Sequence, residues 1–182
     1  MKRKIQIIAL ALTLAASAAV ADDAVIVGGQ SMFPAKNIIE NAVNSKDHTT
    51  LVAAVKAAGL VDTLEGPGPF TVFAPTDAAF SKLPAGTVDN LLKPENKDTL
   101  VKILTYHVVP GKLTFKELAK RIKAGGGKAE LTTVSGETLW VMMNGDHNIV
   151  LEDTKGNMAN ISTYDVMQSN GVIQVIDTVL MP

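Results

Sequence analysis

The sequence predicts an α+β domain in which helices and strands are segregated along the chain. The first half places apolar residues at helical spacing, whereas the part after Lys128 alternates apolar and polar residues between turn-forming sequences. This segregation is typical of α+β proteins and differs from the alternation of strand and helix in a parallel sheet. At 182 residues, the chain is long enough for one domain with a substantial core but too short for two large ones.

The first 21 residues predict a secretory signal peptide. Basic residues at 2–4 precede an apolar run at 5–20, and Ala19-Val20-Ala21 provides small residues at a cleavage site. An uncleaved membrane anchor is the alternative, but the run is shorter than the roughly 20 residues that a spanning helix needs. Cleavage would leave 161 residues, with 14 basic and 18 acidic side chains. We therefore expect an exported, mildly acidic protein without a transmembrane segment, located in the periplasm, at the cell surface or outside the cell.

Residues 22–34 are predicted to form an N-terminal lead-in, and residues 35–182 to form the main domain. Apolar residues at 38–43 recur at helical spacing and predict the first helix. Asp47 is suited to the N-cap of a second helix, which Gly59 would close. The domain should therefore begin with two short helices.

A Gly-Pro-Gly-Pro sequence at 66–69 is the strongest turn signal in the chain. β-branched and aromatic residues at 70–73 then predict a buried strand, which Pro75 ends. The following segments predict helices, and Pro110-Gly111 turns the chain before the last of them. The apolar faces of these helices contain Phe80, Leu83, Val88, Leu91, Leu100, Ile103, Leu104, Phe115, Leu118 and Ile122.

The C-terminal third predicts an antiparallel meander. Short runs of strand-forming residues are separated by Ser-Gly, Asn-Gly-Asp and Lys-Gly-Asn sequences, which favour tight turns. The expected strands cover residues 131–134, 139–142, 148–151, 159–161 and 171–175.

The composition argues against several kinds of chemistry. Because the chain has no cysteine, it can form no disulfide, cysteine nucleophile or cysteine metal site. Its three histidines lack the spacing of a helical zinc site, and the glycines at 125–127 follow a helix without the sequence of a phosphate-binding loop. No nucleophile–base set and no cluster of basic and aromatic residues is evident. We expect a non-enzymatic protein with no cofactor, no metal and no nucleic-acid partner.

His107 is the polar residue that most needs an explanation. It follows an apolar helix face and precedes two valines, so we expect it to be at least partly buried and hydrogen-bonded. Asp77, at the start of the helix after the first buried strand, is the expected partner. A role for His107 in contacting a ligand is the alternative.

Three motifs in this order resemble those of fasciclin domains. They are FTVFAPTDAAF at 70–80, LTYHVVPG at 104–111 and NGVIQVIDTVLMP at 170–182. The resemblance covers nearly all of the chain after the lead-in. It implies a wedge-shaped β-sandwich with helices packed around one side, which agrees with the α+β class.

The resemblance also implies roles for particular residues. In animal fasciclin domains the Tyr-His segment is implicated in receptor contact, and it corresponds to Tyr106-His107 here. Pro75, Gly111 and Gly171 would set turns in the three motifs, and Asp77 with His107 would tie two motifs together. These residues therefore have a structural interpretation beside the functional one.

Two functions agree with these observations. The first is an exported adhesion or surface-interaction module that binds proteins, cell-surface components or another copy of itself. The second is a periplasmic small-ligand-binding or sensory subunit with an apolar groove between helices and sheet. Methionines are adaptable lining residues for such a groove, and the candidates are Met142, Met143, Met158 and Met167.

Overall fold

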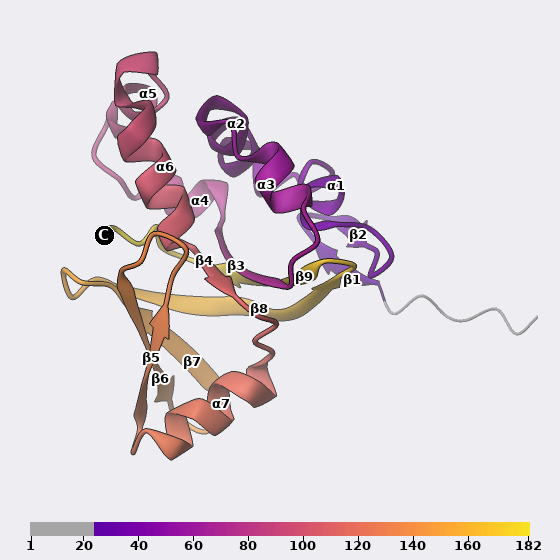
Figure 1. Ribbon diagram of the computed structural model, residues 1–182, viewed down its shortest axis with the longest axis vertical. Coiled ribbons are helices and arrows are strands. Elements are labelled where there is room, and N and C mark those ends of the chain that lie inside the picture. The colour runs from indigo at the N-terminus through magenta and orange to yellow at the C-terminus, as the bar shows by residue number, and fades with distance from the viewer. Residues whose placement is uncertain (1–23) are drawn as a thin grey trace, which may run out of the picture.

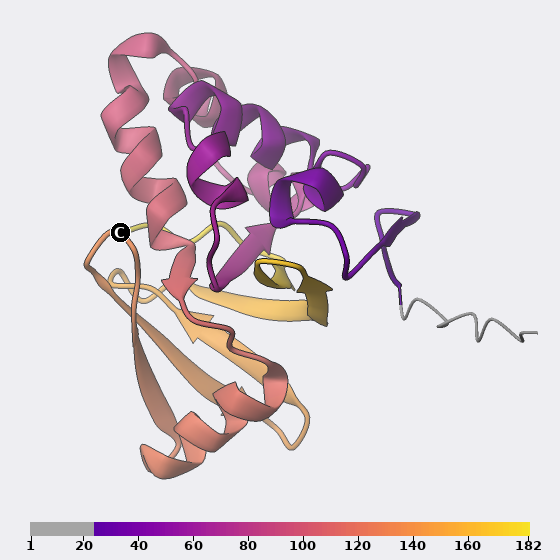
Figure 2. The same cartoon turned by 45° about the vertical axis from the view of Figure 1, so that its right-hand side comes forward.

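A computed structural model describes residues 24–182, in which all helices lie before residue 125, interspersed with four strands, and only strands follow (Figures 1 and 2). The helices are α1 (Ile38–Ala42), α2 (Thr49–Ala58), α3 (Val61–Glu65), α4 (Asp77–Ser81), α5 (Thr87–Leu91), a 3₁₀ turn (Pro94–Asn96), α6 (Lys97–Tyr106) and α7 (Phe115–Ala124). The strands are β1 (Val25–Val27), β2 (Gln30–Met32), β3 (Phe70–Pro75), β4 (Val108–Pro110), β5 (Lys128–Thr132), β6 (Thr138–Asn144), β7 (Asn148–Glu152), β8 (Met158–Gln168) and β9 (Gly171–Ile176). The predicted signal peptide lies outside the described residues.

Seven of these strands form one mixed sheet in the order β4-β3-β9-β8-β7-β6-β5. The pairing is antiparallel throughout except between β3 and β9, which are parallel. The two ends of the sheet approach each other, because the Val134 N–H, just after β5, donates to the Val108 carbonyl of β4 at 2.8 Å. The predicted α+β class is confirmed, and the sandwich takes the form of one sheet that nearly closes as a barrel.

Hydrophobic cores lie on both faces of the sheet. Val72 and Ala74 of β3 belong to the core beneath the helices, whereas Phe73 belongs to the core enclosed by the sheet. Successive strand residues point to opposite faces, so a central strand with a core on each side is apolar at every position. This explains why the run at 70–75 is apolar except at Thr71, whose buried hydroxyl donates to the Gly111 carbonyl at 2.7 Å.

The helices occupy two separate places (Figures 1 and 2). Helices α1 to α6 gather over one side of the sheet, where α2 packs against α6. Helix α7 lies apart from them, at the far end of the molecule, against β5 and β6. Its buried residues Leu118 and Ile122 contribute to the core inside the sheet.

The lead-in forms a short β-hairpin of its own. Strands β1 and β2 pair in antiparallel register, and Val27 and Met32 are buried in the core beneath the helices. Gly28 at the hairpin turn lies against the backbone of Lys46 and Asp47. The hairpin therefore closes one end of the helical layer. Among the helices within residues 24–182, none combines the length and apolar character needed to cross a membrane.

Candidate functional site

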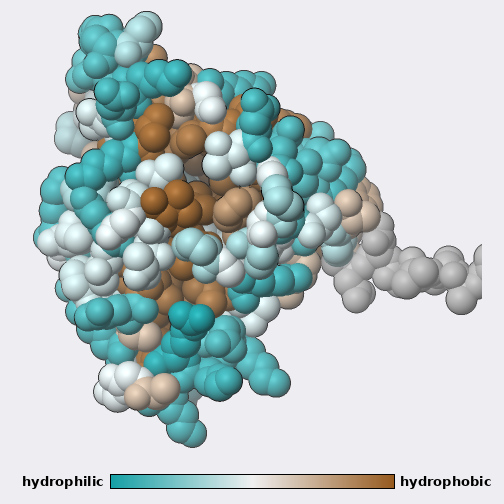
Figure 3. All heavy atoms as spheres, viewed as in Figure 1, coloured by the Kyte–Doolittle hydropathy of each residue, from teal (hydrophilic) through white to brown (hydrophobic). Residues whose placement is uncertain are grey.

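An apolar groove lies between two groups of helices in the described chain. It runs between α2–α3 and α6, above β3 and β4, and the β1–β2 hairpin lies at one end. Hydrophobic side chains gather around this hollow in the space-filling view (Figure 3). The cavity has a volume of about 70 Å³. Its lining includes Met32, Ile39, Val52, Val55, Leu60, Leu64, Phe70, Leu104 and Val166.

The lining differs in one respect from the expectation. Met32 of the hairpin is the methionine that lines the groove, whereas Met142, Met143, Met158 and Met167 are absent from its wall. Met142 and Met143 belong to β6, which lies farther along the sheet, whereas Met158 and Met167 belong to β8, in which Val166 lines the groove instead. The prediction of an apolar groove between helices and sheet is thus correct, but the choice of methionines is wrong.

His48 provides a polar atom within this apolar wall. Its side chain is 3% exposed, and Nδ1 lies 2.8 Å from the Ser45 hydroxyl. The other ring nitrogen, Nε2, has no partner in hydrogen-bonding geometry among the described residues. Burial lowers the pKa of His48 and outweighs the opposing effect of the Ala74 carbonyl. The wall of the groove therefore includes a buried imidazole whose charged form is disfavoured.

His107 is buried beside the groove and hydrogen-bonded at both ring nitrogens. Nε2 accepts the backbone N–H of Leu180 at 3.1 Å, so Nδ1 carries the proton and donates it to the Ile103 carbonyl at 2.8 Å. Burial lowers its pKa to about 4. The expected pairing of His107 with Asp77 is wrong, because backbone groups of α6 and the C-terminal segment satisfy the ring instead.

Tyr106 is fully buried on the other side of the chain from the groove. It belongs to the core inside the sheet, and its hydroxyl donates to the Thr138 carbonyl at 2.9 Å. Burial raises its pKa to about 12. Because Tyr106 is 0% and His107 2% exposed, neither ring reaches the surface of the described structure.

Asp77 caps a helix that begins 28 residues earlier in the chain. Its carboxylate accepts the backbone N–H groups of Thr49 and Thr50, at 3.2 and 2.8 Å, and the Thr49 hydroxyl at 2.6 Å. The predicted cap, Asp47, makes no such bond, and the N-cap position of α2 is occupied by His48. Partial burial opposes ionisation, but these hydrogen bonds hold the pKa of Asp77 below its usual value.

The turn residues of the three motifs lie at the two ends of β3, with Gly111 and Gly171 near its start and Pro75 at its end. Pro75 is the last residue of β3, where it pairs with Ile176 of β9. Gly111 adopts a φ of 100°, in the region that favours glycine, and its N–H donates to the Pro69 carbonyl at 2.8 Å. Gly171 has no room for a side chain, because a Cβ would overlap the Phe70 carbonyl oxygen.

Asn170, for which the sequence predicts no role, joins three segments. Its Oδ1 accepts the Ile38 N–H at 3.0 Å, and its Nδ2 donates to the carbonyls of Leu64 and Gly66 at 2.7 and 2.9 Å. The residue is 9% exposed. The Asn-Gly sequence at 170–171 could only indicate a turn, because its partners lie more than 100 residues away.

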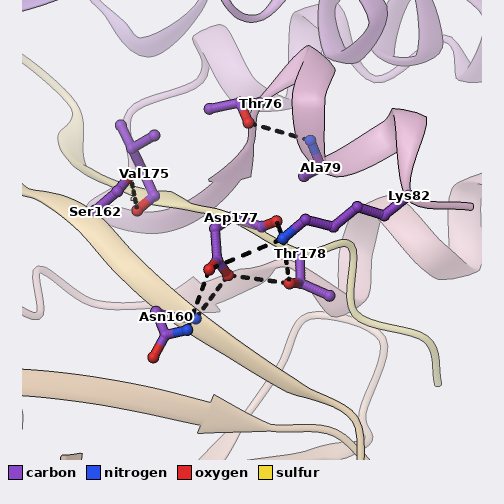
Figure 4. Close-up of polar contacts among 8 residues, drawn as sticks. All are labelled: Thr76, Ala79, Lys82, Asn160, Ser162, Val175, Asp177 and Thr178. Carbon is purple, nitrogen blue, oxygen red and sulfur yellow. Dashed lines mark hydrogen bonds and ion pairs between the residues drawn. The ribbon is translucent and has the colours of Figure 1, made fainter.

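A polar cluster joins the helical layer to the sheet at the end of β9 (Figure 4). Lys82, which ends α4, donates to the Asp177 carbonyl oxygen at 2.6 Å. The Asp177 carboxylate accepts the backbone N–H and the side-chain amide of Asn160, at 2.9 and 3.1 Å, and the Thr178 hydroxyl at 3.0 Å. All the acceptors of Asp177 are thus engaged within the protein, which indicates a structural connection.

The polar side chains around the groove are few. The described residues bring no group of three or more histidine or acidic side chains into metal-binding proximity. Each of the two histidines beside the groove has a hydroxyl or backbone partner. The groove can therefore accept an apolar group.

Comparison with known proteins identifies relatives of the chain. The family model described as "Fasciclin domain" matches residues 46–182. Protein sll1483 of Synechocystis is 51% identical over 148 residues, which cover 81% of this chain and 74% of that protein. The cell surface glycolipoprotein MPB83 of Mycobacterium bovis is 37% identical over 146 residues, covering 78% and 58% of the two chains.

The fold is also that of a solved structure. A FAS1 domain pair from the insect cell adhesion molecule Fasciclin I matches with a TM-score of 0.72 and 22% identity. The match covers 82% of this chain and 52% of that one. The chain therefore spans about half the length of this domain pair.

Proposed function

The chain belongs to the fasciclin domain family, and from this premise we propose that it is an exported, non-enzymatic surface-interaction protein. In this role it binds a protein or another cell-surface component, including a second copy of itself. The observation that carries the proposal is family membership, since the relative MPB83 is named a cell surface glycolipoprotein. Residues 1–21 would serve as the signal peptide, 22–34 as the lead-in and 35–182 as the fasciclin domain.

Within this proposal, Tyr106 and His107 position the fold and do not themselves contact the partner. Their burial and their bonds to backbone carbonyls support this assignment. Pro75, Gly111 and Gly171 have the same kind of role, because each stands where strands or turns approach closely. The partner is then recognised by exposed side chains.

Binding to cells tests this function directly. We expect the labelled protein to bind saturably to cells of its own host, and deletion of its gene to reduce their attachment to one another or to a surface. Heat-denatured protein is the control, because it has the same composition without the folded surface. The proposal fails if deletion leaves attachment unchanged and a pull-down with the folded protein recovers no cell-surface component.

The groove favours a second function, the binding of a small apolar ligand. Its wall is formed by aliphatic and aromatic side chains from four helices and from strands of both sheets, and it includes the His48 ring, whose Nε2 has no hydrogen-bond partner among the described residues. Small-molecule sites commonly combine such an apolar lining with few polar groups. Under this proposal the domain carries or senses a ligand that presents one hydrogen-bonding group.

Native mass spectrometry of protein purified from its own host would test ligand binding. We expect a retained small molecule, and at least a tenfold lower occupancy in Val52→Phe, because the larger ring fills part of the groove. Val43→Phe is the matched control, since Val43 is 48% exposed and lies outside the lining. Wild-type protein without any bound molecule, or equal occupancy in both variants, would count against this function.

A further inference from the structure

The basic residues of the chain are concentrated around α7. Residues 112–128 contain six of the 14 basic side chains that follow the predicted signal peptide, but only one acidic side chain. The remainder of that part of the chain has eight basic and 17 acidic residues. The charge is therefore unevenly distributed. Residues 112–128 have a formal charge of +5, whereas the other residues after the predicted signal peptide, here called the acidic body, have a formal charge of −9.

Three lysines of α7 form one exposed stripe. Lys116, Lys120 and Lys123 stand at helical spacings of four and three residues, so they share a side of the helix. All three are exposed, whereas Leu118 and Ile122 on the other side are buried in the core. We call Lys116, Lys120 and Lys123 the lysine face.

The charge of the lysine face is not neutralised within the described chain. Arg121 is 3.6 Å from Glu117, and Lys128 is 2.6 Å from Glu152. In residues 24–182, no carboxylate lies within ion-pair distance of the three lysines of the face. Their ammonium groups are therefore free to interact with a partner.

The position of α7 makes this stripe accessible. The helix lies at the end of the molecule opposite α1–α6 (Figures 1 and 2), where its outer side is convex. A convex stripe of charges fits an extended, flat partner better than it fits a narrow chain or a protruding loop. We propose that the lysine face docks the protein on an anionic phospholipid surface.

The residue types on α7 favour a lipid surface over an acidic polysaccharide. Lysine is a point charge without the planar, bidentate geometry of arginine, so it suits a diffuse array of phosphates. The lysine face of α7 contains no aromatic residue to stack on sugars. Phe115 instead packs edge-to-face against Tyr164, with 5.1 Å between ring centroids.

Docking by this face would be electrostatic and would not insert the helix. Insertion requires an exposed apolar side, but Leu118 and Ile122 are 0% and 1% exposed. The acidic body would be repelled by the same surface, so the protein should bind in one orientation, with α7 toward the headgroups. This inference rests on the proposed function only in requiring that the protein meets a membrane after export.

Vesicle binding tests the inference. We expect the exported protein to co-sediment with vesicles of phosphatidylglycerol and phosphatidylcholine at 20 mM salt, and to be released at 500 mM. Each lysine near an anionic surface contributes about a fivefold gain in binding, so K116Q/K120Q/K123Q should lower the partition coefficient on the order of a hundredfold. Vesicles of phosphatidylcholine alone should bind neither the wild-type protein nor the triple variant.

A second triple variant separates the placement of charge from its amount. Lys46, Lys93 and Lys155 are exposed lysines elsewhere, and K46Q/K93Q/K155Q has the same net charge as the first variant. This control should retain most of the binding. Equal losses in both variants, salt-insensitive binding, or binding to polygalacturonate but not to vesicles would overturn the inference. Attachment to cells is measured in a separate experiment. A protein that binds to cells but not to vesicles would therefore contradict this inference and leave the proposed function standing.

Discussion

Asn170→Ala is expected to lower the free energy of unfolding by about 3–5 kcal/mol, because it leaves several buried backbone groups without partners. The Asn170 side chain satisfies the Ile38 N–H at the start of α1 and the Leu64 and Gly66 carbonyls at the end of α3. Each buried group left unpaired costs about 1–3 kcal/mol. Urea denaturation followed by circular dichroism measures the change.

The matched control for this prediction is Asn90→Ala. Asn90 is exposed on α5, and its side chain makes no hydrogen bond within the described residues. We expect its stability to remain within about 0.5 kcal/mol of wild type. A loss at Asn170 no larger than this would mean that the three segments are held together by packing alone.

Acidification from pH 7 to 4.5 is expected to destabilise the protein by about 2–3 kcal/mol through His107 alone. The pKa of His107 is about 4 in the fold, against 6.5 in an unfolded chain, because burial disfavours the charged ring. Between these values the unfolded chain binds a proton that the folded protein excludes. Stability is thus fully present above pH 6.5 and is lost as the pH falls toward 4. Burial also lowers the pKa of His48, so its contribution to stability changes with pH in the same direction.

His107→Gln isolates this contribution, since glutamine does not titrate. We expect the difference in unfolding free energy between pH 7 and 4.5 to be smaller in this variant, whereas His147→Gln, at an exposed position, should behave as wild type. The carboxyl groups of Asp77 and Asp177 have lowered pKa values, so their contribution is lost only below about pH 4. An NMR titration in which the His107 ring protonates near pH 6.5 would refute the prediction even if the variant does not fold.

The sequence predicted those elements whose signals are local. The buried strand at 70–75 and the helix of Leu100 and Leu104 follow from periodicity and turn residues within a few positions. The meander strands β6 and β7 were found for the same reason. The groove was also expected, because two helices and a sheet with apolar faces were predicted.

Features that depend on distant contacts could not be predicted in the same way. Asp47 has a suitable side chain and position to cap α2, but Asp77 approaches from a different helix and takes that role. Strand β8 continues to Gln168, well past the predicted 159–161. Its second half contains register shifts and Asp165 at a φ of 54°, so the alternation of apolar and polar residues is lost.

The central position of β9 determines when the protein can fold. This strand contains the last regular residues of the chain, yet it lies between β3 and β8 and joins the two halves of the sheet. Until residues 171–176 have been synthesised, β3–β4 and β5–β8 are separate pieces with open edges. The complete sheet can therefore form only after residues 171–176 have been added, and before that point its two parts can form only separately.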